Sequence, residues 1–374
     1  MIISKKHSRA DISLLIIVTA LSIWGTVMIF SAGSAYALAR YDDPYFFIKR
    51  QIIWLILGYL IMIFASEIPP IIYKKATPYL YAITLFLLVL VLAIGFVGNG
   101  AKRWISIGPI TVQPSEIAKL TIVMMLSYYF SVNEEKALSN AKGNSFKYGT
   151  VIPCLIFVVP IILVMLQKHL SCIIIIGLIG LCMTVCAGVN LKYISFFCSL
   201  GIGGVVSLAL FTDYTKERIT VWRNPSAYKL TGGWQTLQGL MAIGSGGIFG
   251  VGLGNSVMKH CYVSEPANDM IFAILCEETG FLGAFLTLLL FAMLIFRGIK
   301  ISLRSSDVYS RLVAFGISIK ITIQTLLNIA VVTNTIPNTG ISLPFFSYGG
   351  SSLLMIFFEM GILLSVSKKA KIIK

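Results

Sequence analysis

The sequence has little charge and offers no soluble domain. Only 12% of its 374 residues are charged, whereas 57% are apolar, and the mean hydropathy is +0.88. A soluble domain carries about 25% charged residues. This chain therefore has too few charged side chains to cover a soluble globule or to keep a disordered chain in solution. The composition predicts a polytopic membrane protein.

Cysteine and histidine are also sparse and scattered. Six of the seven cysteines lie in apolar stretches, which argues against a disulfide framework. We interpret Cys182 and Cys186, four residues apart, as small buried residues rather than a metal or redox pair. The three histidines, His7, His169 and His260, have no metal-ligand spacing. We expect no metal site and no cofactor, and the sequence does not decide whether a divalent cation assists.

Long apolar runs dominate the chain. A transmembrane helix takes about 20 mostly apolar residues. No cleavable signal peptide is evident, so we expect the first run to be retained as a span. The expected fold class is an all-α polytopic membrane protein with ten transmembrane helices, forming a single domain over residues 1–374. The predicted spans are 12–33, 52–66, 78–97, 116–132, 149–167, 170–189, 194–211, 270–296, 312–333 and 348–366.

The basic residues set the expected orientation. With the N-terminus in the cytoplasm, 17 of the 30 Lys and Arg residues lie inside and 11 lie outside. Five of those 11 belong to the long outer loop 212–269, and long loops contribute little to the positive-inside rule. The count predicts that both termini are cytoplasmic. Orientation thus accounts for most of the net charge of +15, and no nucleic-acid partner is expected.

One apolar segment of the outer loop is not counted as a span. Residues 237–254 contain seven glycines, and an eleventh span would place the Lys-rich tail outside. Irregular backbone is tolerated at membrane depth where protein covers it. We therefore expect a re-entrant or interfacial segment within loop 212–269, between spans 7 and 8.

Ionisable residues inside the spans are costly and are candidates for function. Glu116 and Lys119 are three residues apart, so they share one helix face and can form an ion pair. Glu277 and Glu278 are either buried hydrogen-bonding groups or direct participants. Lys320 needs a partner at that depth, and Glu359 or Glu278 could supply it.

The outer segments carry patterns that flexible spacers do not need. Lys102-Arg103-Trp104-Ile105 leads to Gln113-Pro114-Ser115-Glu116, where Ser115 is expected to cap a helix. Glu265 and Asp269 lie where the long outer loop becomes a span. A partly desolvated carboxylate at such a mouth is a stronger base, although Asp269 could also act only as a helix cap.

The last span is preceded by a third such segment, which runs from Pro337 to Ser352 and contains Ser347-Tyr348-Gly349-Gly350. Two prolines exclude a regular helix there, and the Gly-Gly pair permits close approach of the backbone. The N-terminus of the helix that follows suits a phosphate. Close packing against another helix is the alternative use of these small residues.

Together these motifs, in this order over residues 10–367, resemble the SEDS family (shape, elongation, division and sporulation), whose branches include FtsW, RodA and SpoVE. The Gly244–Gly247 stretch and the Ser342–Tyr348 stretch are closer in appearance to FtsW and SpoVE than to RodA. The motifs that carry the resemblance are Lys102–Ile105, Gln113–Glu116 with Lys119, Ala242–Gly247 with Gly250–Gly252, Asp269–Ala273 with Glu277–Gly280, and Thr339-Gly340 with Leu343–Phe345 and Ser347–Ser352.

The resemblance implies a ten-span peptidoglycan glycosyltransferase of the bacterial cytoplasmic membrane. Such a protein polymerises lipid II on the outer face, beside a class B penicillin-binding protein that acts as the transpeptidase. The resemblance marks Asp269 as the catalytic residue, and Arg103, Glu116 and Lys119 as functional positions. It does not decide between cell division, sporulation and elongation, which determines cell shape.

Two departures from the family pattern limit what can be carried over. After the fifth span the family usually has Gln-Pro-Asp-Leu-Gly, whereas this chain has Gln167-Lys168-His169-Leu170-Ser171, so an outer acidic residue is lost. The family often has His-Thr before the catalytic Asp, and here Ala267-Asn268 stands in that place. A helper histidine is therefore absent, while Asp269 itself is kept.

The hypothesis is an inverting glycosyl transfer that releases undecaprenyl diphosphate. Asp269 would act as general base on the acceptor hydroxyl. The leaving diphosphate needs cations, which Arg103 and Lys119 or the loop cations could supply. The expected substrate-binding residues are Arg103, Trp104, Glu116, Lys119, Arg218, Arg223, Lys229, Glu265, Ser347, Gly349 and Gly350.

Two other functions fit parts of the sequence. Ten spans, intramembrane charges and a glycine-rich half-helix would suit a flippase or transporter for a lipid-linked sugar. The short, plainly basic inner loops argue against a pathway open to both faces. A non-catalytic scaffold for division or sporulation proteins would need only packed spans, and it would leave Asp269 and Arg103 without a purpose.

Overall fold

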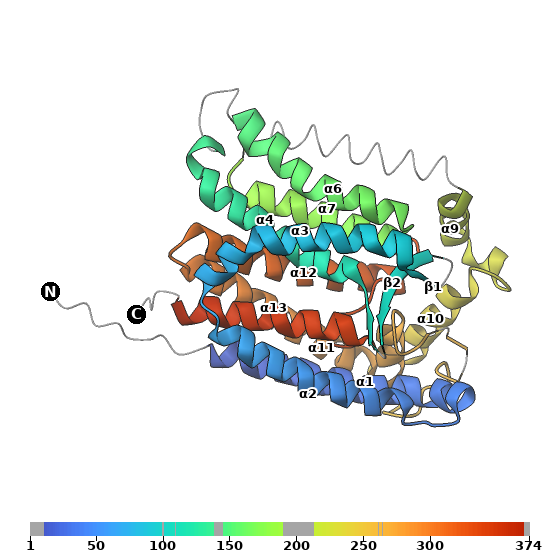
Figure 1. Ribbon diagram of the computed structural model, residues 1–374. Coiled ribbons are helices and arrows are strands. Elements are labelled where there is room, and N and C mark those ends of the chain that lie inside the picture. The colour runs from blue at the N-terminus through green and yellow to red at the C-terminus, as the bar shows by residue number, and fades with distance from the viewer. Residues whose placement is uncertain are drawn as a thin grey trace.

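The computed structural model describes residues 11–98, 101–108, 110–137, 145–189, 213–260, 262–263 and 265–369. The predicted seventh span, 194–211, lies outside these residues. In the described part, long helices run side by side, with the short helices and strands gathered at one end (Figure 1). The helices are α1 (Ile12–Tyr41), α2 (Phe46–Glu67), α3 (Pro70–Ile94), α4 (Pro114–Ala137), the π-helix η1 (Ser145–Val151), α6 (Ile152–Leu166), α7 (Leu170–Cys186), α9 (Asp213–Arg223), the 3-10 helix η2 (Pro225–Tyr228), α10 (Trp234–Ser245), α11 (Ile271–Arg304), α12 (Val308–Val332) and α13 (Gly350–Lys369).

Seven of the described helices are long and apolar enough to cross a membrane: α1, α2, α3, the η1–α6 unit, α11, α12 and α13. Each overlaps one of the predicted spans. Among the other predicted spans, 170–189 corresponds to α7, which is apolar but only 17 residues long. The span 116–132 corresponds to α4, whose Glu116 and Lys119 lower its hydropathy.

Two helices begin earlier than the sequence indicated. The prediction that the third span starts at 78 is wrong, because α3 starts at Pro70 and continues through Pro78. Proline is favoured in the first turn, where its missing N–H is not needed. The second span was expected from 52, whereas α2 starts at Phe46 and includes Lys49 and Arg50. Apolar content identifies only the apolar part of a helix, so a prediction based on it leaves out the polar ends.

Among the described residues, one small sheet interrupts the helical fold. Strands β1 (Phe96–Gly98), β2 (Ala101–Ile107) and β3 (Ile110–Val112) form an antiparallel sheet in the order β1-β2-β3. Phe96 pairs with Trp104, and Ile105 pairs with Val112. The segment is rich in β-branched residues, which favour strands, and the turn after β2 includes Gly108 at φ 62°. The sheet packs on α3 and α4 and carries Arg103 and Trp104 at one end of the bundle.

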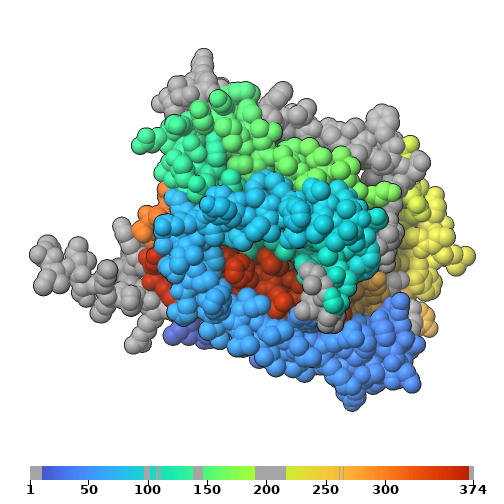
Figure 2. Space-filling view, viewed as in Figure 1, coloured from blue at the N-terminus to red at the C-terminus, as the bar shows by residue number. Residues whose placement is uncertain are grey.

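Glycines bring α2 and α13 into close contact. A Cβ atom at Gly58 would lie 2.3 Å from the Phe357 ring, and one at Gly361 would lie 2.6 Å from Ala65 Cβ. Small residues permit this approach between membrane helices, where packing replaces the hydrophobic effect as the driving force. In Figure 2, α13 (red) reaches the surface between α2 and α3.

The first and last long helices meet at the end of the bundle opposite the sheet. The Asp11 N–H donates to Ser367 Oγ over 3.2 Å, and the Asp11 carboxylate pairs with Arg297 at 2.9 Å. The start of α1, the end of α13 and the final turns of α11 therefore lie side by side. This placement agrees with the expectation that both termini are on one side.

Helix α11 is broken at Gly280, which has φ 64° and ψ −164°. A break in a helix leaves backbone groups without their usual partners. The glycine-rich turn after α10 supplies the missing partners. Glu277 O accepts from Val251 N over 3.0 Å, while Phe281 N donates to Gly247 O over 2.9 Å. The neighbouring pairs, Gly252 N with Glu278 O and Leu282 N with Ile248 O, complete the match at 3.0 and 3.1 Å.

This backbone-to-backbone contact explains two of the glycines of the segment 237–254, Gly246 and Gly250. A Cβ at Gly250 would lie 2.2 Å from Glu278 O, and one at Gly280 would lie 2.4 Å from Gly250 N. Gly250 also has φ 80°, which side chains disfavour. The segment forms the 12-residue helix α10 and an irregular turn against α11. It is too short to be a further spanning helix.

Candidate active site

Asp269 lies two residues before α11, in a segment that two other elements hold in place. Asn328 Nδ2 on α12 donates to Asp269 O over 2.9 Å. Ser347 Oγ donates to Asn268 O over 2.8 Å, and Tyr348 N donates to Ala267 O over 2.9 Å. The backbone at the carboxylate is therefore fixed from α12 and from the segment before α13.

The loop 334–348 forms the wall facing the Asp269 side chain. A Cβ at Gly340, which has φ 69°, would lie 3.6 Å from Asp269 Oδ2. Gln235 of α10 hydrogen-bonds the same carboxylate. Asn338 Nδ2 donates to Gln235 Oε1 over 3.1 Å, and the Arg218 guanidinium of α9 donates to the Asn338 carbonyl. Elements far apart in the chain thus converge on one carboxylate.

The surroundings of Asp269 favour a base that works near neutral pH. Burial and, to a smaller extent, the nearby Glu265 carboxylate raise the pKa of its carboxyl from 3.8 to about 7. Arg218 and Gln235 oppose this rise but do not cancel it. A general base works best when its pKa lies near the operating pH. Asp269 Oδ1 is buried and has no hydrogen-bond partner among the described residues, so it can accept a proton.

Glu116 and Lys119 form the predicted ion pair. Lys119 Nζ lies 2.7 Å from Glu116 Oε1, and the two residues are only 3% and 7% exposed. The expectation that Ser115 caps the helix is wrong, because Pro114 already occupies the first helical position. Ser115 Oγ instead lies 3.3 Å from His169 Nδ1.

Arg103 lies against the turn where the chain departs from the family pattern. Its Nη2 donates to Lys168 O over 2.5 Å, and Lys168 adopts φ 54°. Burial, followed by the charges of Arg103 and Lys119, lowers the pKa of His169 to about 3. The histidine is therefore neutral at physiological pH and adds no charge where the family usually has an acid.

A polar stripe on α12 joins the Lys119 region to Asp269. Lys320, Gln324 and Asn328 follow one another at intervals of four residues, so they lie on one helix face. Gln324 Oε1 lies 3.5 Å from Lys119 Nζ, and its Nε2 donates to Ser342 O over 3.1 Å. Asn328 donates to Ile341 O over 2.6 Å in addition to Asp269 O. Gln324 and Asn328 are not among the predicted site residues, although their spacing from Lys320 is a signal that could have found them.

Lys320 itself pairs with Glu359 of α13, one of its two predicted partners. The residues are 1% and 0% exposed, and Glu359 Oε2 has no hydrogen-bond partner among the described residues. The other suggested partner, Glu278, is used elsewhere. This pair lies at mid-length of α12 and α13, away from Asp269.

Glu277 and Glu278 both bond to residues of the loop 212–269. Glu277 accepts from Ser256 Oγ and from Val257 N, the latter over 2.9 Å. Lys259 Nζ lies 3.0 Å from Glu278 Oε1, and Lys259 is only 4% exposed. Of the two roles that the sequence left open, the contacts favour buried hydrogen-bonding groups. They also remove Lys259 from the outer cations available to a diphosphate.

The other candidate residues divide into fixed and exposed ones. Ser347 accepts from Leu343 N over 2.7 Å as well as donating to Asn268, so its hydroxyl is already used. A Cβ at Gly350 would lie 2.4 Å from the Trp54 ring, so this glycine meets another helix. Gly349 precedes α13 and Trp104 is half-buried on β2, whereas Arg223 and Lys229 are exposed on the outer loop.

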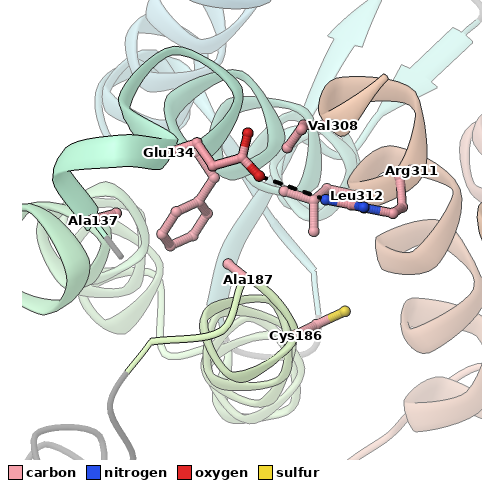
Figure 3. A pocket seen from close by; sticks show the side chains of 8 residues that line it. Glu134, Ala137, Cys186, Ala187, Val308, Arg311 and Leu312 are labelled. Carbon is pink, nitrogen blue, oxygen red and sulfur yellow. Dashed lines mark ion pairs between the residues drawn. The ribbon is translucent and has the colours of Figure 1, made fainter. Parts of the chain in front are cut away.

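No metal cluster marks another site in the described part of the chain. Within those residues, no group of three or more His, Cys, Asp or Glu side chains could hold a metal ion. A small pocket of about 30 Å³ lies between α4, α7 and α12, at the end of α4 opposite Glu116 (Figure 3). Its polar groups are Arg311 and Glu134, which pair at 3.8 Å. None of the residues that line it contacts Asp269 in the hydrogen bonds described above.

Comparison with known proteins places the chain in a family. The model described as "Cell cycle protein", FTSW_RODA_SPOVE, matches residues 12–372. Stage V sporulation protein E of Bacillus subtilis is 39% identical over 370 residues, covering 98% of this chain and 99% of that protein. The chain belongs to the SEDS family. A probable peptidoglycan glycosyltransferase FtsW of Geobacter sulfurreducens is 33% identical over 371 residues, with 98% and 97% covered. The predicted likeness to SpoVE and FtsW is confirmed.

Solved structures of this SEDS fold superpose on the chain. Rod shape determining protein RodA of Thermus thermophilus has a TM-score of 0.71 at 25% identity and covers 96% of this chain and 97% of its own. A chain of a structure described as "Structural coordination of polymerization and crosslinking by a peptidoglycan synthase complex" has a TM-score of 0.79 at 25% identity, again with 96% and 97% covered. The architecture of the described residues is that of a multi-pass SEDS membrane protein.

Proposed function

We propose that the protein polymerises lipid II into glycan strands, with Asp269 as the general base. The protein is a peptidoglycan glycosyltransferase of the SEDS family. The observation that supports the assignment of Asp269 is its half-buried carboxylate, which has a pKa near 7 and one oxygen without a partner among the described residues. The substrate would be an undecaprenyl-diphosphate-linked disaccharide, and the reaction would serve cell division or sporulation.

The proposed step is an inverting displacement. Asp269 Oδ1 takes the proton of the acceptor sugar hydroxyl as that oxygen attacks the anomeric carbon of the donor. The bond between the anomeric carbon and the diphosphate oxygen breaks, and undecaprenyl diphosphate leaves with the electron pair. A general base contributes about 10²–10⁴-fold to such a rate.

Cations near the mouth would stabilise the leaving diphosphate. Arg218 supports this role because it lies close enough to Asp269 to lower the pKa of that carboxyl. Arg103 and Lys119 are held by Lys168 O and Glu116, so they would contribute from fixed positions. The exposed Arg223 and Lys229 would meet the substrate as it enters. Trp104, Glu265, Ser347, Gly349 and Gly350 would complete the lining.

The active site would face the outside of the cytoplasmic membrane. We propose ten spans in a single domain over residues 1–374, made of the seven long apolar helices, α4, α7 and the segment 194–211, with both termini inside. The glycine-rich turn of loop 212–269 would then lie at the outer membrane boundary. The exposed Ile248 and Phe249, 65% and 79% accessible, support a lipid-facing turn.

A class B penicillin-binding protein is the proposed partner. A chain with the same fold belongs to a peptidoglycan synthase complex that couples polymerisation to crosslinking. A strand made at the Asp269 mouth would be passed to a transpeptidase on the same side of the membrane.

Polymerisation of labelled lipid II by the purified protein tests the proposal, with and without a class B partner. Wild type should form long glycan strands, and Asp269→Asn and Asp269→Ala should lower the rate by about 10²-fold or more. Glu217→Gln, which alters an exposed carboxylate of α9, is the matched control and should leave the rate unchanged. Near-normal polymer from Asp269→Asn would refute the general-base assignment.

The same preparations separate the alternative functions. A protein that moves labelled lipid II across a vesicle membrane but forms no polymer would be a flippase. Normal growth of cells that carry only the Asp269→Ala, Arg103→Ala double variant would indicate a scaffold. Either result would overturn the proposed activity.

A further inference from the structure

The amide of Gln235 has a defined orientation. An amide side chain has one accepting side and one donating side. Asn338 Nδ2 donates to Gln235 Oε1 over 3.1 Å, so the oxygen of Gln235 faces Asn338. The amide nitrogen is then left to donate to the Asp269 carboxylate, with which Gln235 is hydrogen-bonded. A flipped amide would place two donors together at Asn338 and two acceptors together at Asp269.

Asn338 is itself held so that it cannot reverse. Gly340 N donates to Asn338 Oδ1 over 3.1 Å, which leaves Nδ2 as the end that faces Gln235. The Arg218 guanidinium donates to the Asn338 carbonyl and fixes the backbone at the same residue. Hydrogen bonds are therefore donated in one direction along the chain of contacts: Gly340 donates to Asn338, Asn338 donates to Gln235, and Gln235 donates to Asp269.

The two oxygens of the carboxylate consequently have different surroundings. Oδ2 faces the loop at Gly340, where an added Cβ would lie 3.6 Å away. Oδ1 has no hydrogen-bond partner among the described residues. We propose that Gln235 is a positioning residue, which, locked by Asn338, holds the Asp269 carboxylate in the rotamer that presents Oδ1 to the acceptor hydroxyl. This inference rests on the proposed function and adds to it the residues that orient the base.

The charges around Asp269 determine how this role can be measured. Glu265 on the same segment and Arg218 on α9 are the charged groups that act on the carboxylate, in opposite directions. Burial raises the pKa of Asp269 to about 7, and the Gln235 hydrogen bond lowers it, because an amide donor stabilises the ionised form. Removing the Gln235 donor should therefore raise the pKa of Asp269 further and leave less of the basic form at neutral pH.

The experiment is the pH dependence of kcat/KM for lipid II polymerisation by the full-length protein with its class B partner. Gln235→Leu should move the acidic limb of the profile upward by about one pH unit. Its kcat/KM should therefore be roughly tenfold below wild type at pH values below the limb and equal to wild type at high pH. Gln235→Glu keeps the size of the side chain and adds a carboxylate, so it should move the limb further. Asn338→Leu leaves the Gln235 donor in place but unlocked, so a smaller shift in the same direction is expected.

Gln238→Leu, the same change one turn along α10, is the matched control and should keep the wild-type profile. An equal loss of rate at every pH for Gln235→Leu and Gln235→Glu, or no change at all, would overturn the positioning role. The proposed function fails in a different way. If Asp269→Asn polymerises normally, or if its profile keeps the acidic limb, then the limb does not belong to Asp269, whatever Gln235 does.

Discussion

Lys259 Nζ lies 3.0 Å from Glu278 Oε1, and the two residues are 4% and 1% exposed. Ser31 of α1 donates to both oxygens of Glu278, over 2.7 and 2.6 Å. A lysine from the outer loop thus reaches into the bundle and joins α1 to α11 just before the break at Gly280. The pair holds the loop that leads to Asp269.

Replacing one partner of this ion pair should lower the free energy of unfolding more than replacing both partners. Lys259→Met leaves the Glu278 charge buried without its partner, which should lower the free energy of unfolding by about 3–5 kcal/mol. The double variant Lys259→Met, Glu278→Leu should recover most of that loss. Lys49→Met breaks the exposed pair with Asp43 and should cost less than about 1 kcal/mol. Thermal unfolding in detergent measures all of them, and equal losses for the single and double variants would contradict the prediction.

The glycines at the break in α11 should tolerate no side chain. Gly280→Ala and Gly250→Ala place a Cβ within 2.4 Å of backbone atoms, at positive φ, so each should lower the unfolding temperature by several degrees. Gly244→Ala is the control of opposite sign, because no atom lies within 4 Å of its added Cβ and alanine favours the helix α10 by about 0.5–1 kcal/mol. Unfolding temperatures that fall for all three variants would contradict the prediction.

Asp269 should reduce stability where it is ionised. Its pKa is about 7 in the folded protein against an ordinary 3.8, so folding favours the protonated form. Stability is therefore greatest below about pH 4 and falls as the pH rises through 7. Asp269→Asn cannot ionise and should be more stable than wild type above about pH 7, with no difference near pH 4. Unfolding curves at both pH values test this, and Glu217→Gln should show no such gain.

Replacing Asn328 should lower the polymerisation rate more than replacing Thr325, a buried neighbour on α12. Asn328→Leu removes the hydrogen bonds to Asp269 O and Ile341 O, so the base should shift and kcat should fall by about 10- to 100-fold. Thr325→Val is the control on the same helix, because Thr325 Oγ1 is buried without a partner among the described residues. Initial rates of polymerisation compare the two, and similar losses would argue for a general disturbance of α12.

His169 should not contribute to the pH dependence. Burial and the charge of Arg103 lower the pKa of His169 to about 3, so it stays neutral throughout the working range of the enzyme. His169→Gln retains a neutral hydrogen-bonding side chain beside Ser115 and should leave the pH profile of polymerisation unchanged. A loss of one limb of the profile would show that the histidine titrates.

The sequence predicted the architecture where apolar length decides it. Spans such as 312–333 correspond to single long helices because a membrane demands about 20 apolar residues. The sheet at 96–112 was missed, since its strands are short and the prediction followed long apolar runs. The extended start of α3 was missed because Pro78 reads as a boundary, whereas the helix continues through it.

The candidate site was predictable as far as single residues carry chemistry. Asp269, Arg103 and the Glu116–Lys119 pair stand out by their charge next to a span. Gln235, Asn338 and Asn328 do not stand out, since neutral amides give no signal until the fold brings the 235, 338 and 328 regions together. Charge alone does not give burial either: Lys259 belongs to the loop 212–269, yet it is buried against Glu278.

The stripe of Lys320, Gln324 and Asn328 has a mechanical consequence. Each of these side chains is tied to a different neighbour, at three successive turns of α12. Turning the helix by one residue, about 100°, would break all three ties at once. These contacts therefore resist rotation of α12. Any rotation of the helix at Lys320 would also move the backbone contact at Asp269.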